Sequence, residues 1–138
     1  MSKNEIDDLM NTEKIGTLML VDGERPYGVV CWFVYDSGSV RIGIIPSGRK
    51  FDCISANDNA AFSVWMAGKG GWCSVFVEGK IRQITDIAEL KGSLKLASEK
   101  YGVPSSYMEK QIALVKESPE KSMSFVIEST NVSGRKSG

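Results

Sequence analysis

Closely spaced turn signals are the feature that most limits how this chain can fold. Asp22-Gly23, the polar stretch 36–39 and the glycine-rich stretch 67–71 each interrupt a run of β-branched and aromatic residues. Six strand-like runs remain, at residues 15–21, 27–35, 40–45, 61–66, 72–84 and 122–128. Short connections join antiparallel strands, because parallel neighbours need a long crossover. Gly79 lies inside the longest run, where a glycine indicates a bulge or bend that favours closing the sheet into a barrel.

Helical patterns flank and interrupt these strands. Ser2 and Glu5 have the spacing of a capping box, which predicts a short N-terminal helix. A second short helix is expected over residues 49–56, and two longer ones over residues 86–102 and 106–118. The helices therefore accompany the strands and do not alternate with each of them, as a parallel α/β fold would require.

The chain of 138 residues is long enough for one substantial core, and no linker divides it. We predict a single, mainly β domain over residues 1–130, built as a six-stranded antiparallel barrel with appended helices. Residues 131–138 are predicted to form a polar C-terminal tail, and the chain from Thr130 onward is expected to be loose unless it docks on a partner.

The charge balance disfavours two classes of partner. The formal net charge is +0 and the isoelectric point is about 6.3, so neither nucleic acid nor an anionic membrane surface is an expected partner. The longest strongly apolar run, residues 29–34, is too short to span a bilayer. The first residues contain no apolar signal region, and a cytoplasmic protein is the expectation.

The chain has no histidine, which removes the usual residue of most hydrolase and metal chemistries. Its three cysteines, Cys31, Cys53 and Cys73, are odd in number and form no Cys-x-x-Cys motif, so reduced, mostly buried thiols are expected. No catalytic residue and no metal ligand can be assigned. The function is therefore expected to depend on a bound cofactor.

One short segment has the features of an anion site. After the run 40–45, Pro46-Ser47-Gly48 forms a turn, and Arg49-Lys50 opens the predicted helix. Backbone N–H groups at a helix start attract anions, and the two cations strengthen this attraction. Arg49 could then bind a phosphate with two hydrogen bonds, while Lys50 acts as a point charge. The alternative is a solvated turn with two surface cations.

Two aromatic positions could contact a planar ligand. Trp32 and Phe33 are consecutive in a strand and must point to opposite faces, so one of them needs a burial partner outside the core, such as a second subunit or a planar ring. Trp72 follows the glycine-rich loop, where it could cover a ring or anchor the loop.

Several short motifs occur in an order typical of one family. They are Ile15-Gly16-Thr17-Leu18, Pro26-Tyr27-Gly28-Val29-Val30, Tyr35-Asp36-Ser37-Gly38, Gly48-Arg49-Lys50-Phe51-Asp52 and Val75-Phe76-Val77-Glu78-Gly79-Lys80. In this order the chain resembles the pyridoxamine 5′-phosphate oxidase-like, FMN-binding split-barrel family, and within it the nitroimidazole-resistance-related branch. The resemblance covers residues 5 to 130.

This resemblance implies a six-stranded split barrel that forms a homodimer, with one FMN at each of two interface sites. Arg49 and Lys50 would hold the phosphate, and residues 43–45 would run beside the ribityl chain and the ring. The cofactor-binding positions implied in this way are Val30, Trp32, Gly43, Ile44, Ile45, Ser47, Arg49, Lys50, Trp72 and Ser74.

The chain departs from the branch at three places. Relatives often have a histidine at the position of Gly43, a small polar residue at that of Ile44 and an arginine near Cys73. The resemblance implies an FMN-dependent oxidoreductase acting on a small planar substrate such as a nitroaromatic or a quinone. The departures keep three alternatives open: a non-catalytic flavin or nucleotide-binding module, a deazaflavin binder, and a dimeric scaffold without ligand.

Overall fold

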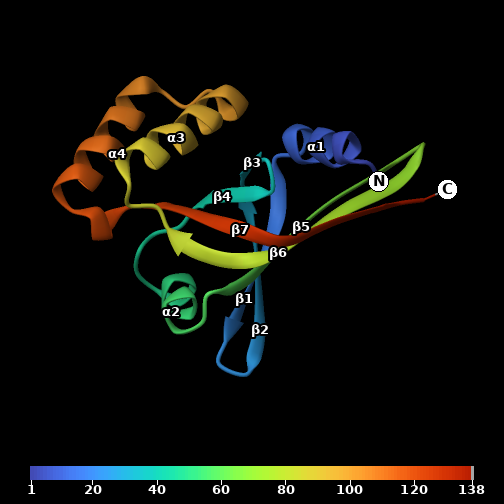
Figure 1. Cartoon of the computed structure of the whole chain (residues 1–138), viewed down its shortest axis with the longest axis horizontal. Helices are drawn as coiled ribbons and strands as arrows, with labels where there is room; N and C mark the ends of the chain where they lie inside the picture. Colours follow the sequence, from blue (N-terminus) through green and yellow to red (C-terminus); the bar gives the residue numbers. More distant parts are fainter. Residues whose placement is uncertain (138) are drawn as a thin grey trace.

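One antiparallel sheet curls around the core, with helices at its ends (Figure 1). The computed structural model describes residues 1–137. The helices are α1 (Lys3–Thr12), α2 (Arg49–Ala56), α3 (Ile87–Tyr101), α4 (Ser105–Glu117) and the 3₁₀ helix η1 (Pro119–Lys121). The strands are β1 (Ile15–Asp22), β2 (Arg25–Trp32), β3 (Val34–Asp36), β4 (Ser39–Gly43), β5 (Asn59–Gly68), β6 (Gly71–Gln83) and β7 (Ser124–Lys136). The mainly β, antiparallel architecture is confirmed.

The strand order explains how the sheet becomes a barrel. It is β2-β1-β5-β6-β7-β4-β3, so the two edge strands are β2 and β3. These edges are consecutive in the chain and are separated only by Phe33. The sheet therefore has to curl until its edges meet at that residue, where they leave a seam.

The prediction of one strand over residues 27–35, and hence of six strands, is wrong at this seam. The N–H of Phe33 donates to the Oη of Tyr101 at 3.2 Å, and this hydroxyl lies 2.6 Å from the Phe33 carbonyl oxygen, to which it donates. The backbone groups of Phe33 are therefore bonded by a side chain of α3 and not by a neighbouring strand. The run divides into β2 and β3, which gives seven strands.

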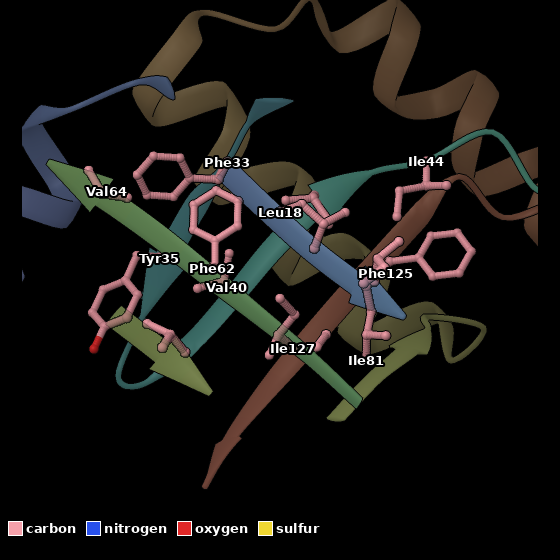
Figure 2. Close-up of a cluster of buried hydrophobic side chains, with 14 of the residues drawn as sticks. Leu18, Phe33, Tyr35, Val40, Ile44, Phe62, Val64, Ile81, Phe125 and Ile127 are labelled. Atoms are coloured by element: carbon pink, nitrogen blue, oxygen red, sulfur yellow. The ribbon is translucent and has the colours of Figure 1, made fainter. Parts of the chain in front are cut away.

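The core fills the inside of the curled sheet. Phe33 is only 1% exposed and packs against Phe62, with ring centroids 4.9 Å apart (Figure 2). A second, smaller cluster lies between the sheet and the helices α3 and α4, and its buried members are Ile84, Leu90, Leu94, Val115 and Val126. The helix pair thus covers one end of the sheet through its own apolar contacts (Figure 1).

The expectation of a loose tail is wrong for residues 130–136, and position 138 of the predicted tail lies outside the described residues. Residues 130–136 extend β7, which pairs with β6 as far as Cys73↔Lys136. The bulge expected at Gly79 is confirmed by a register shift between Glu78 and Gly79, where a Cβ would collide with the Glu128 carbonyl oxygen. Lys136 Nζ also bonds Glu5 Oε2 at 2.7 Å and holds the pKa of Glu5 at about 2.

The bonding of Phe33 by the Tyr101 hydroxyl leads to a prediction about stability. Tyr101→Phe should keep the ring but leave two buried backbone groups of Phe33 without their partner, at a cost of about 1–3 kcal/mol in the free energy of unfolding. Urea denaturation of the wild type and the variant measures this difference. Tyr107→Phe is the matched control, because Tyr107 is exposed on α4. Equal effects of the two substitutions would contradict the assigned role of the Tyr101 hydroxyl.

Candidate functional site

A cavity of about 550 Å³ lies between the seam side of the sheet and the helix pair α3–α4. Its walls come from residues 31–34 at the seam, residues 41–45 of β4 and the chain after it, the facing sides of α3 and α4, and the first residues of β7. This volume is within the usual range for small-molecule sites. Four of the ten predicted binding residues line it: Trp32, Gly43, Ile44 and Ile45.

Trp32 forms one wall and is paired with a residue of α3. Its ring is stacked on that of Tyr101, with centroids 5.4 Å apart and planes 9° from parallel. Trp32 is nevertheless 67% exposed, whereas Phe33 is buried, so the predicted opposite orientation of these two residues is confirmed. Tyr101 supplies part of the burial that Trp32 needs, and the remaining surface of the indole is available to a ligand or a second subunit.

Successive side chains of β4 point to opposite faces of the sheet, and on the cavity side they leave open space above the strand. Ile42 and Ile44 are buried in the core, so Arg41 and Gly43 face the cavity side. A Cβ built at Gly43 would have the Met123 carbonyl oxygen, 3.9 Å away, as its nearest contact. The absence of a side chain at position 43 therefore contributes open volume directly above the strand.

The chain leaves this cavity through a tight turn and enters α2. The Ser47 N–H donates to the Ile45 carbonyl at 2.8 Å, and Gly48 takes a positive φ of 90° as the N-cap. No side chain caps α2, so its first N–H groups remain available to an anion. Ser47 is exposed beside this helix start and is not part of the cavity wall.

Arg49 is held by the hairpin between β1 and β2. Its Nε and Nη2 donate to Asp22 Oδ2 at 3.0 and 2.9 Å, and its guanidinium lies 3.9 Å from the centre of the Tyr27 ring. The hydrogen bonds from Arg49 to Asp22 raise the pKa of Arg49. An anion at the start of α2 therefore competes with Asp22 for this guanidinium.

Lys50 follows Arg49 in the first turn of α2 and is not among the residues that line the cavity. It is half-buried, makes no salt bridge within residues 1–137, and its charge acts on the thiol of Cys31 in the cavity wall. Burial outweighs that charge and raises the pKa of Cys31 to about 11. The thiol is thus neutral. Lys50 is a second cation in the first turn of α2, beside Arg49.

The structure separates the remaining predicted residues from this cavity. Val30 is 64% exposed on the outer face of β2. Trp72 and Ser74 lie at the start of β6, which pairs with the end of β7 through Ser74↔Arg135, whereas the cavity is lined by the first residues of β7. Trp72 lines a different cavity of about 470 Å³, beside α1 and the end of β7.

The sequence patterns gave no sign of the helix side of the cavity. Ser93, Tyr101, Tyr107 and Gln111 line it from α3 and α4, and Arg41 faces them from β4. Tyr101 continues the apolar stripe of its helix, so the sequence pattern predicts a core residue at this position. Within residues 1–137 we find no group of three acidic or cysteine side chains placed to hold a metal ion, and no helix with the length and apolarity to cross a membrane.

Comparison with known proteins adds a family and a fold. A family model described as pyridoxamine 5′-phosphate oxidase matches residues 2–136. No curated protein matches the chain.

Three solved structures illustrate the fold. An FAD-binding protein from Mesorhizobium loti is 22% identical, with a TM-score of 0.74 over 100% of this chain and 95% of that one. An FAD-binding protein from Mycobacterium smegmatis is 18% identical, with a TM-score of 0.72 over 99% and 95%. A candidate 5-nitroimidazole antibiotic resistance protein from Bacteroides thetaiotaomicron is 16% identical, with a TM-score of 0.72 over 96% and 82%. At these identities the likeness establishes a shared fold.

Proposed function

The chain belongs to the pyridoxamine 5′-phosphate oxidase family, and on this premise we propose that it is a flavin-dependent oxidoreductase that acts on a small planar substrate. One observation carries the proposal. The cavity above Gly43 is lined as far along the chain as Ile45, and after the turn 46–48 the chain enters α2, whose start has no side-chain cap and contains Lys50 in its first turn. An open apolar volume connected to an anion site suits a ring joined by a flexible chain to a phosphate.

In this proposal the phosphate binds at the start of α2. The N–H groups of the first turn and Lys50 would hold it, with Ser47 beside them. Arg49 would add a hydrogen bond through the side of its guanidinium that Asp22 leaves free. FMN is the cofactor that the family resemblance favours, while two relatives are named as FAD-binding. Both contain the same phosphate, ribityl chain and ring, so the site as proposed accepts that shared part.

The ring would lie in the cavity along residues 43–45, with the exposed side of Trp32 against it. A bound flavin supplies reversible two-electron chemistry that no side chain of this protein offers. The protein would contribute orientation through the walls of the cavity, and the apolar side chains of Ile45, Leu94 and Ala97 would exclude water from it. The three free thiols suit a reducing compartment, which supports a cytoplasmic location.

We further propose a homodimer formed through the outer face of the sheet. The pairs Ile15↔Trp32, Trp65↔Ser74 and Ser63↔Phe76 place apolar side chains on the face opposite the core. Val30, Trp32, Ile15, Trp65 and Trp72 are each about half exposed or more. A contiguous apolar face of this kind favours a protein partner. In such a dimer, Val30, Trp72 and Ser74 would contact the cofactor bound by the partner subunit.

The first prediction concerns retention of flavin. Wild-type protein mixed with FMN and passed through a desalting column should keep the flavin absorption at about one per subunit. Removing both cations in Arg49→Ala/Lys50→Ala should weaken binding by tenfold or more, because charge-assisted hydrogen bonds contribute about 1.5–3 kcal/mol each. Lys80→Ala is the control, since Lys80 forms an exposed pair with Asp58. Equal affinity of the double variant and the wild type would exclude this phosphate site.

The second prediction concerns the dimer. Trp65→Lys should leave the monomer folded, because Trp65 is 68% exposed, but should place a charge in the proposed interface. Sedimentation should then show a dimer for the wild type and a monomer for the variant. Ala113→Lys on the exposed side of α4 serves as the control. A wild-type monomer, or a dimer that survives Trp65→Lys, would contradict the interface.

The third prediction concerns activity. Flavin-loaded protein should oxidise a reduced nicotinamide with a quinone or a nitroaromatic as acceptor, faster than the same amount of free FMN. Absorbance of the nicotinamide at steady state measures this rate. Retained flavin without turnover across such acceptors would favour a non-catalytic flavin-binding module over an enzyme.

A further inference from the structure

We propose that the cavity recognises an anionic substrate, with Arg41 binding a carboxylate at one end of an otherwise apolar ring site. This inference specifies the substrate class of the proposed function and rests on it for the identity of the neighbouring cofactor. The role of Arg41 itself is inferred from the residues that line the cavity.

Arg41 is the single charged side chain in that wall. Among the lining residues within 1–137 there is no aspartate, glutamate or lysine. The other polar side chains on the helix side, Ser93, Tyr107 and Gln111, are neutral. A ligand that fills this volume therefore meets one cation and no anion, which favours a negatively charged group over a neutral or positive one.

Among the described residues, the positive charge of Arg41 has no carboxylate partner of its own. Its Nη1 donates to Ser93 Oγ at 2.7 Å, and its Nε is 3.5 Å from Ser39 Oγ. No salt bridge forms at Arg41 within residues 1–137. The guanidinium is half-buried and bonded by hydroxyl groups, so it retains donors for an incoming acid.

The closest candidate to neutralise Arg41 is already engaged. Glu89, one turn before Ser93 on α3, receives two hydrogen bonds from Arg82, both of 2.7 Å. These bonds are the main reason why the pKa of Glu89 is lowered, and the charge of Arg41 adds only a smaller effect. Glu89 is therefore committed to Arg82, while Arg41 remains available.

The position of Arg41 suits a substrate placed beside a cofactor ring. Arg41 and Gly43 share one face of β4 and are two residues apart, which is about 7 Å along a strand. A ring above Gly43 would then have the guanidinium at its edge, and Leu94 and Ala97 of α3 would face it across the cavity. Arginine binds carboxylates with two parallel hydrogen bonds, so it can fix both the charge and the plane of an aromatic acid.

A pair of probes that differ in charge tests this proposal. Calorimetric titration of the FMN-loaded protein with 4-nitrobenzoate and with 4-nitrobenzamide compares the same ring and nitro group with and without a carboxylate. The wild type should bind the acid more tightly by about tenfold, the value of one charge-assisted hydrogen bond. Arg41→Gln should remove this preference and leave binding of the amide unchanged.

Two further variants separate ligand binding from a structural role of Arg41. Ser93→Ala removes the bond that attaches Arg41 to α3 but keeps the charge, so the preference for the acid should persist. Lys95→Gln removes a positive charge from the exposed side of the same helix and should have no effect on the preference. Loss of the preference in Lys95→Gln would show a general charge effect and would overturn the assignment.

The remaining outcomes distinguish a failure of the Arg41 assignment from a failure of the proposed function. An Arg41→Gln variant that keeps the preference, or a wild type without one, would refute the proposal even when flavin is retained. If Arg41→Gln loses the flavin absorption, then Arg41 binds the cofactor and the substrate assignment is wrong. A wild type that prefers the acid but retains no flavin would support the anion site and refute the proposed function instead.

Discussion

The hydroxyl of Tyr101 is the contact on which the architecture depends. It satisfies both backbone groups of Phe33, the one residue between the two edge strands of the sheet. A buried N–H and a buried carbonyl without partners would disfavour this break, so the helix side chain allows the sheet to close with a seam. The same ring stacks on Trp32, which attaches the helix pair to the sheet beside the cavity.

The cavity is a consequence of this closure. Its walls are the seam, the cavity side of β4 and the helices α3 and α4, and these segments meet because the helices are inserted between the neighbouring strands β6 and β7. Gly43 keeps the strand surface open, and the chain leaves β4 directly toward the uncapped start of α2. The cavity and the start of α2, which we propose to bind the ring and the phosphate, are thus joined by one short continuous segment of the chain.

The three cations Arg41, Arg49 and Lys50 differ in whether they form a salt bridge within residues 1–137. Arg49 is held by Asp22 and Tyr27, whereas Lys50 and Arg41 make no salt bridge within residues 1–137. In our proposals Lys50 helps to bind the phosphate at the start of α2, and Arg41 lies in the wall of the cavity that would hold the ring.

Local patterns in the sequence were sufficient for the turns, most strands, the capping box of Ser2 and Glu5 and the bulge at Gly79, since each depends on residues a few positions apart. They also placed Arg49 and Lys50 at a helix start. The seam, the extension of β7 to Lys136 and the polar lining from α3 and α4 were decided by the tertiary structure. Phe33 and Tyr101 are 68 positions apart in the chain, and no local pattern encodes which distant donor will replace a strand. The separation of Trp72 and Ser74 from the cavity likewise follows from the register between β6 and β7, which pairs these residues with the end of β7 that is distant from the cavity.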